Sequence, residues 1–277
     1  MTSDNLYIDL LKKVLIDYHR MEMGETPPLR KDRKHKMKYK FLFMLENILG
    51  KKGFTIREKV PYNKDQRERG LDWPAYAESM IGLKRMENLE FCVNDTIKND
   101  IPGDLIETGV WRGGSVIFMR ALLKVAGVTD KTVWVADSFE GLPKPDEDKY
   151  AADKGDIHHT LSDILAISEE QVRNNFKKFG LLDEQVKFLK GWFKDTLPTA
   201  PIEKLSVLRL DGDMYESTIQ ALDFLYPKLS IGGYLIIDDF DVVPGCKQAV
   251  MDYRQQHNIS ENIIDIDGSG SFWKRLR

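Results

Sequence analysis

The sequence predicts an α/β protein that has an open, mostly parallel sheet and a helical extension at its amino terminus. Its 277 residues are enough for one large domain, or for a core of about 200 residues with an extension. After Pro102 and Gly103, strand patterns alternate with helical patterns, as parallel strands joined by crossover helices do. Before that point only helical patterns occur. We therefore expect a helical extension over residues 1–100, which would also cover the site, and an α/β domain over 101–277.

The elements of the extension follow from the spacing of its apolar residues. Helical periodicity predicts helices at 5–18, 41–49 and 78–97. The segment 21–39 is rich in proline and charge and is expected to be poorly ordered, and 51–70 is polar and is expected to be a connector. Such amphipathic helices need a partner surface for their apolar faces, so we expect a homo-oligomer.

Seven strands and four helices are predicted in the α/β domain. The strands fall at 104–109, 132–137, 186–191, 205–211, 233–238, 262–267 and 271–276, and the helices at 115–125, 168–179, 217–229 and 246–257. Only Gly268, Ser269 and Gly270 separate the last two strands, which predicts an antiparallel hairpin. The polar segment 137–168 is either an active-site cover or a mobile loop.

Composition narrows the class of protein. The net charge of −3 is too balanced to indicate nucleic acid or a membrane as partner. The basic run at 30–40 is more simply an exposed segment than a polyanion-binding patch. The two cysteines, Cys92 and Cys246, are far apart, which argues against a disulfide framework or a zinc site. The chain lacks a signal-peptide pattern and any run of transmembrane length, so we expect a cytoplasmic protein.

Carboxylates follow two of the predicted strands. The strand at 205–211 leads into Asp211, Gly212 and Asp213, and the strand at 233–238 leads into Asp238 and Asp239. If these strands are neighbours, four acids meet at the carboxyl edge of the sheet, where open α/β sheets bind ligands. Such a cluster repels itself unless a cation or protons neutralise it. Its oxygen ligands favour Mg²⁺ or Ca²⁺ over zinc. The structural alternative is that the acids cap helices or pair with arginine and lysine.

The first three strands also end in residues that suit a nucleoside ligand. Glycines after the first strand allow close backbone approach, but their spacing differs from the dinucleotide fingerprint. Glu107 within that strand suits a cationic amine, and Asp137 at the next strand end is placed for ribose hydroxyls. After the third strand, Gly191 permits close approach and Trp192 either stacks on a base or belongs to the core. The pair His158 and His159 is expected at the surface, unless loop closure brings it to a substrate.

Taken together, several motifs resemble the macrocin O-methyltransferase family, whose members methylate sugar hydroxyls of natural products. They are DLIETGVWRGGS, ADSFEGLP, LDGDMYEST and GYLIIDDF, preceded by SMIGLKRMENL, and the resemblance runs from about Trp73 to the carboxyl terminus. It implies a Rossmann-like class I methyltransferase that uses S-adenosylmethionine and Mg²⁺. The resemblance places Mg²⁺ on Asp211, Asp238 and Asp239, and it makes Asp213 the general base. With the residue-level interpretation above, the cofactor site comprises Met80, Ile81, Glu107, Gly109, Ser115, Asp137, Ser138, Gly191, Trp192 and Asp211.

The expected function is therefore methyl transfer to a hydroxyl, one of a vicinal pair on a deoxysugar of a glycosylated small molecule. A metal-dependent catechol-type methyltransferase, with an aromatic diol as acceptor, is the nearest alternative. A noncatalytic α/β module that binds Ca²⁺ or a partner on its acidic rim is the alternative from another class. It would leave Glu107 and Asp137 without a ligand. A nicotinamide dehydrogenase is disfavoured by the glycine spacing.

Overall fold

A twisted seven-stranded sheet forms the centre of the computed structural model, which describes residues 2–20, 37–59 and 61–277. Among these residues the strand order is β3-β2-β1-β4-β5-β7-β6. The first five strands of that order run parallel, while β7 is antiparallel to both β5 and β6. The predicted fold class, including the terminal hairpin, is confirmed. The strands are β1 (Asp104–Thr108), β2 (Val133–Asp137), β3 (Val186–Lys190), β4 (Leu205–Leu210), β5 (Leu229–Ile237), β6 (Ile264–Asp265) and β7 (Ser271–Lys274).

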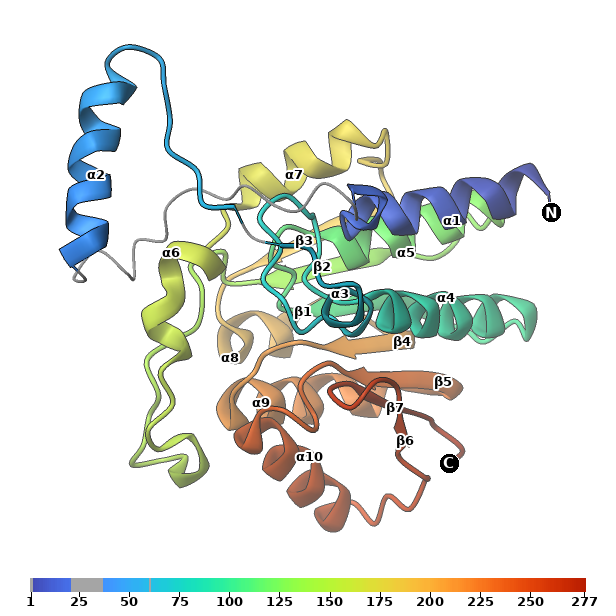
Figure 1. The fold of residues 1–277 in the computed structure, drawn as a ribbon. Helices are drawn as coiled ribbons and strands as arrows, with labels where there is room; N and C mark the ends of the chain where they lie inside the picture. Colours follow the sequence, from blue (N-terminus) through green and yellow to red (C-terminus); the bar gives the residue numbers. More distant parts are fainter. Residues whose placement is uncertain (1, 21–36, 60) are drawn as a thin grey trace.

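Helices cover both faces of the sheet (Figure 1). Neighbouring strand residues point to opposite faces, so Leu105 belongs to the core under α1, α4, α5 and α7, whereas Ile106 belongs to the core under α9 and α10. Both cores are strongly apolar, as expected of parallel strands that are buried on two sides. The α-helices are α1 (Ser3–Leu15), α2 (Met37–Gly50), α3 (Lys64–Arg69), α4 (Leu83–Lys98), α5 (Gly114–Val125), α6 (Ser162–Leu165), α7 (Glu169–Lys178), α8 (Phe193–Thr196), α9 (Tyr215–Leu225) and α10 (Pro244–Gln256).

The helices of the extension share the core of the α/β domain. Helices α1 and α4 pack on α5, and Ile8, Leu11 and Leu15 of α1 are buried there. Other apolar residues of α1, such as Leu10, are exposed, and α2 lies away from the sheet in Figure 1 with Phe41 exposed. The expected homo-oligomer stays a prediction. Within the described residues, no helix has the length and apolar character needed to cross a membrane.

Three expectations for the extension need correction. The helix predicted at 78–97 begins only at Leu83, because the backbone of residues 78–81 pairs with other segments, for example Glu78 N–H with the Leu15 carbonyl at 2.8 Å. The connector at 51–70 contains α3, a polar helix without apolar periodicity that Asn63 caps. Residues 37–39, expected to be poorly ordered, begin α2. Residues 21–36, with most of the basic run, lie outside the described residues.

Smaller corrections concern the α/β domain. The helix predicted at 217–229 ends at Leu225, and β5 starts at Leu229, four residues before the predicted start. The first strand of the terminal hairpin is reduced to Ile264–Asp265. The segment 138–168 between β2 and α7 contains two 3₁₀ turns, Ala151–Asp153 and His158–Leu161, as well as α6. These elements are too short to leave a periodic signal.

The register of the sheet brings the carboxyl ends of β1, β4 and β5 level. The Asp211 N–H donates to the Thr108 carbonyl and the Asp238 N–H donates to the Leu210 carbonyl, both at 2.9 Å. Gly109 follows β1 with a φ of +85°, and a Cβ at this position would overlap the Asp211 carbonyl oxygen. Glycine is therefore required here for the turn after β1 to lie against the end of β4.

Candidate active site

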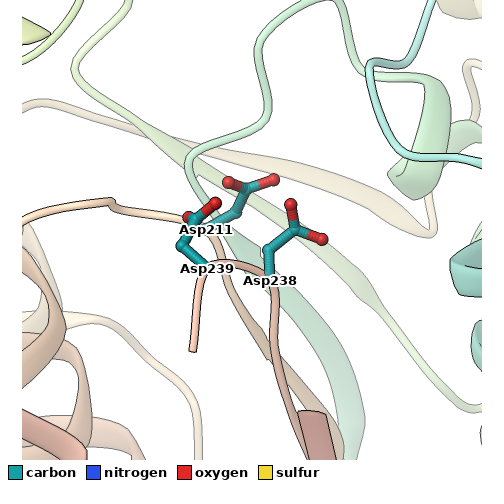
Figure 2. A group of neighbouring side chains, drawn as sticks. All are labelled: Asp211, Asp238 and Asp239. Atoms are coloured by element: carbon teal, nitrogen blue, oxygen red, sulfur yellow. The ribbon is translucent and has the colours of Figure 1, made fainter. Parts of the chain in front are cut away.

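Three carboxylates converge where β4 and β5 end. Asp211, Asp238 and Asp239 each offer an oxygen, and these oxygens all lie within 4.8 Å of one another. Figure 2 shows the three side chains grouped at the ends of their strands. Adjacent residues on a regular strand point apart, but the chain turns directly after Ile237, so Asp238 and Asp239 reach the same space. Asp213 follows at the start of the segment leading to α9, with a left-handed φ of 55°.

Two buried arginines enter the cluster. The Arg209 guanidinium donates to Glu107, to Asp238 and, at 2.9 Å, to Asp211. Arg85 of α4 donates to the other oxygen of Asp238 and, at 3.0 Å, to Asp267. The acids are thus partly neutralised by arginine, as the structural alternative anticipated, while the group of three remains together. Arg209 was not among the predicted site residues, although a charged residue inside the apolar run LSVLRL is the local signal of its role.

The arginines divide the cluster electrostatically. Burial would raise the pKa of Asp238, but Arg209 and Arg85 outweigh it and hold that pKa below its usual value. Burial is the largest cause that raises the pKa values of Asp211 and Asp239 well above their usual range, and the neighbouring carboxylates raise them further. No arginine among the described residues pairs with Asp239. Its Oδ2 is buried and has no hydrogen-bond partner within that part of the chain. A positive charge is therefore most favourable between Asp211 and Asp239.

Asp213 has a different environment from the three grouped acids. Burial raises its pKa to about 6, and the nearby His158 opposes this rise. His158 in turn is held by Asp156, with Nδ1 and Oδ2 2.8 Å apart. Asp238 and Asp156 raise the pKa of Asp213 further. Burial alone would lower the pKa of His158, but Asp156 and Asp213 outweigh it and raise that pKa. The histidine expected at the surface is thus only 31 % exposed and lies in the electrostatic field of Asp213.

A cavity of about 270 Å³ opens beside the acids at the carboxyl edge of the sheet. It brings together most of the predicted cofactor residues with Asp213. Those lining it are Met80, Gly109, Asp137, Ser138, Gly191, Trp192, Asp211 and Asp213. Ile81, Glu107 and Ser115 do not line it. The Ser115 hydroxyl and Arg209 both donate to Glu107, so the cation beside this carboxylate is the arginine of the same protein.

Asp137 is held in position at the end of β2. Its two carboxylate oxygens accept from the backbone N–H groups of Val110 and Phe139, each at 2.7 Å. The Ser138 hydroxyl also donates to Oδ1, at 3.5 Å, and the Trp111 N–H contributes a further backbone hydrogen bond to this carboxylate. The backbone bonds orient this carboxylate before any ligand arrives.

Most of the other residues that line the cavity belong to no predicted cofactor or metal site. Trp111 lines it and donates from Nε1 to the Ile164 carbonyl at 2.9 Å, which ties the segment 138–168 to the turn after β1. The remaining walls come from that segment, from α8 and from the first turns of α9. They are Gly141, Leu142, Pro143, Lys144, Asp146, Leu165, Phe193, Lys194, Gly212, Glu216, Ser217 and Gln220. Of the extension, Met80 is the one described residue that lines the cavity.

A parallel sheet that ends in an antiparallel hairpin, with a cavity and an acidic cluster at its carboxyl edge, defines a Rossmann-like methyltransferase. The chain matches the Macrocin-O-methyltransferase (TylF) family over residues 4–275. It belongs to this family and is an O-methyltransferase.

Individual relatives agree with this assignment. The chain is 49% identical over 276 residues to demethyldecarbamoylnovobiocin O-methyltransferase of Streptomyces niveus. This alignment covers 100% of this chain and 95% of that protein. It is 55% identical over 210 residues to 8-demethyl-8-(2,3-dimethoxy-α-L-rhamnosyl)-tetracenomycin-C 4′-O-methyltransferase of Streptomyces olivaceus, covering 76% and 80% of the two chains. The solved structure of the O-methyltransferase NovP superposes with a TM-score of 0.85 at 47% identity, covering 99% of this chain and 100% of that one.

Proposed function

We propose that the protein transfers a methyl group from S-adenosylmethionine to a sugar hydroxyl of a glycosylated small molecule, and that Mg²⁺ takes part. The observation that carries the proposal is the convergence of Asp211, Asp238 and Asp239 beside a cavity that also contains Asp137 and Asp213. Relatives whose names specify O-methylation, in one case of a rhamnosyl group, support the reaction and the sugar acceptor.

The residues present fit a hard divalent cation. The three acids supply only oxygen ligands, which Mg²⁺ prefers. Asp239 contributes a buried oxygen that has no partner among the described residues, and Asp211 carries one oxygen that Arg209 does not use. When bound, such a cation would lower the pKa of a coordinated hydroxyl, as zinc lowers that of water to about 7.

The side chains of the chain itself would do the remaining work. Asp137 binds the ribose hydroxyls of the cofactor, and Trp192, which lines the same cavity, contacts the base. Asp213 accepts the proton of the acceptor hydroxyl, because it lines the same cavity as Asp211, one of the proposed ligands of the cation. Alignment of the hydroxyl with the donated methyl then supplies much of the rate.

Substitution of the proposed base provides the first test. We expect Asp213→Asn to lose turnover by at least about a hundredfold, within the range of general-base effects. Binding of S-adenosylhomocysteine, measured by calorimetry, should stay within twofold of the unchanged protein. Normal turnover by the variant would remove Asp213 from this role.

A panel of acceptors separates the sugar from the catechol alternative. It contains demethyldecarbamoylnovobiocin, 8-demethyl-8-(2,3-dimethoxy-α-L-rhamnosyl)-tetracenomycin C and catechol, each with and without EDTA. We expect methylation of a glycosylated compound, loss of it in EDTA and recovery with Mg²⁺. Methylation of catechol alone would favour the aromatic-diol function, and full activity in chelator would overturn the role of the cation.

A further inference from the structure

The segment 138–168, which forms one wall of the cavity, is joined to α9 by a buried aspartate. Asp153 lies at the end of a short 3₁₀ turn and is only 2% exposed. Its Oδ1 accepts from the Tyr215 N–H at 2.6 Å and its Oδ2 accepts from the Glu216 N–H at 2.9 Å. The residue preceding α9, Met214, makes no side-chain cap. A remote residue therefore caps the helix that begins two positions after Asp213, and a carboxylate is well suited to this helix end.

The neighbouring helix α10 leaves room for this carboxylate. Gly245 lies in its first turn, and a Cβ at that position would be 2.9 Å from Asp153 Oδ1 and 3.0 Å from the Tyr215 nitrogen. Such contacts are too short for ordinary packing, so a larger residue at 245 would require the Asp153 carboxylate or the Tyr215 backbone to shift. The Asp153 side chain, which belongs to segment 138–168, thus contacts α9 and lies next to the first turn of α10.

Further contacts extend from Asp153 toward the reaction site. The rings of Tyr150 and Tyr215 pack at a centroid distance of 5.8 Å, so segment 138–168 and α9 touch on a second side. In the other direction the Asp153 carbonyl accepts from the Asp156 N–H at 3.0 Å, and Asp156 holds His158. The wall residues Lys144 and Asp146 come from this segment, and they face the same cavity as Asp213 and Glu216.

We propose that Asp153 is a positioning residue for methyl transfer, which locks the wall formed by segment 138–168 to the start of α9 and so sets the placement of the acceptor relative to Asp213. The inference rests on the proposed function, because it assigns this wall to the acceptor. Asp153 does not line the cavity itself. Its effect passes through the backbone of Tyr215 and Glu216, and small displacements of reacting groups are costly in rate.

The test compares Asp153→Asn with Gly245→Ala. Asparagine keeps the size of the side chain but presents an amide NH₂ to one of the two N–H groups, while alanine at 245 crowds the cap without changing Asp153. For both variants we expect at least a tenfold loss of kcat with the best acceptor of the panel and a rise in its KM. We expect S-adenosylhomocysteine affinity within twofold of the unchanged protein. Hydrogen exchange at the Tyr215 and Glu216 amides should become at least tenfold faster.

Thr2→Ala is the matched control. Thr2 caps α1, where its hydroxyl accepts from the Asn5 N–H at 3.2 Å, and it neither belongs to segment 138–168 nor lines the cavity. This variant loses a helix cap of the same kind and should keep kcat and KM within twofold. The proposal is overturned if Asp153→Asn shows the faster exchange with unchanged kcat and acceptor KM, or if Thr2→Ala reduces kcat as much. An unchanged protein that methylates no acceptor overturns the proposed function instead.

Discussion

Replacing Arg209 by methionine is expected to destabilise the protein more than any single loss of a surface ion pair. Methionine keeps most of the apolar stem, so the change removes the charge and its hydrogen bonds with little loss of volume. In the native protein the Arg209 side chain is 1% exposed, and it contacts Glu107, Asp211 and Asp238. Asp238 retains Arg85 after the substitution. Among the described residues, Glu107, also 1% exposed, then retains only the Ser115 hydroxyl.

The magnitude follows from this loss of compensation. Removing one partner of a buried ion pair costs about 3–5 kcal/mol, because a buried charge remains without a counter-charge. The main uncompensated group here is Glu107, so we expect a loss of about 4 kcal/mol in the free energy of unfolding. At about 2–3 °C per kcal/mol for a chain of this size, Tm falls by roughly 10 °C.

The assay is thermal unfolding at pH 7 with EDTA present. Lys13→Met serves as the control, since Lys13 pairs with Asp9 at 2.6 Å and the two side chains are 39% and 41% exposed. It should cost at most about 1 kcal/mol. The double variant Arg209→Met with Glu107→Gln should recover part of the loss, because the carboxylate charge is then also gone. If Arg209→Met lowers Tm no more than Lys13→Met does, the proposed electrostatic role of Arg209 is refuted.

Three further outcomes are expected from the structure. Mg²⁺ at about 100 times its Kd should stabilise the protein by about 2.7 kcal/mol, which is measured as a rise in Tm. Asp239→Asn should abolish this rise, and an equal rise in the variant would place the ion elsewhere. Gly109→Ala should prevent folding or S-adenosylhomocysteine binding, because its Cβ would overlap the backbone of Asp211, directly after β4. Gly127→Ala, with nothing within 4 Å of the added Cβ, should cost about 1–2 kcal/mol of left-handed backbone strain. Comparable losses at both glycines would contradict the close approach of the β1 turn. The hydrogen bond from Arg120 lowers the pKa of Asp183, so this pair stabilises the fold above the unfolded pKa of about 3.9 and its contribution is lost as pH falls through the lower folded value. Urea titrations between pH 2 and 5 should therefore show a shallower acid loss for Asp183→Asn, and an identical slope would argue against the pair.

The parts of the site that were predictable from sequence are those whose placement depends on local pattern. Strands that end in Asp137, Asp211 and Asp238 show as apolar runs followed by acids, and parallel neighbours bring such ends to one edge. The sequence did not determine that β4 and β5 are neighbours; the structure shows that they are. Asp211, Asp238 and Asp239 therefore lie together, and Asp238 and Asp239 converge because β5 ends before them.

What the sequence by itself determined is the alternation of strands and helices and the chemistry at each strand end, because both depend on periodicity within about ten residues. Only the tertiary structure decided which acids are neutralised and how the walls of the cavity are held. Arg85 reaches Asp238 across 153 positions, and Asp153 reaches Tyr215 across 62. Such pairings depend on side-chain direction and burial after packing, and no local pattern encodes them.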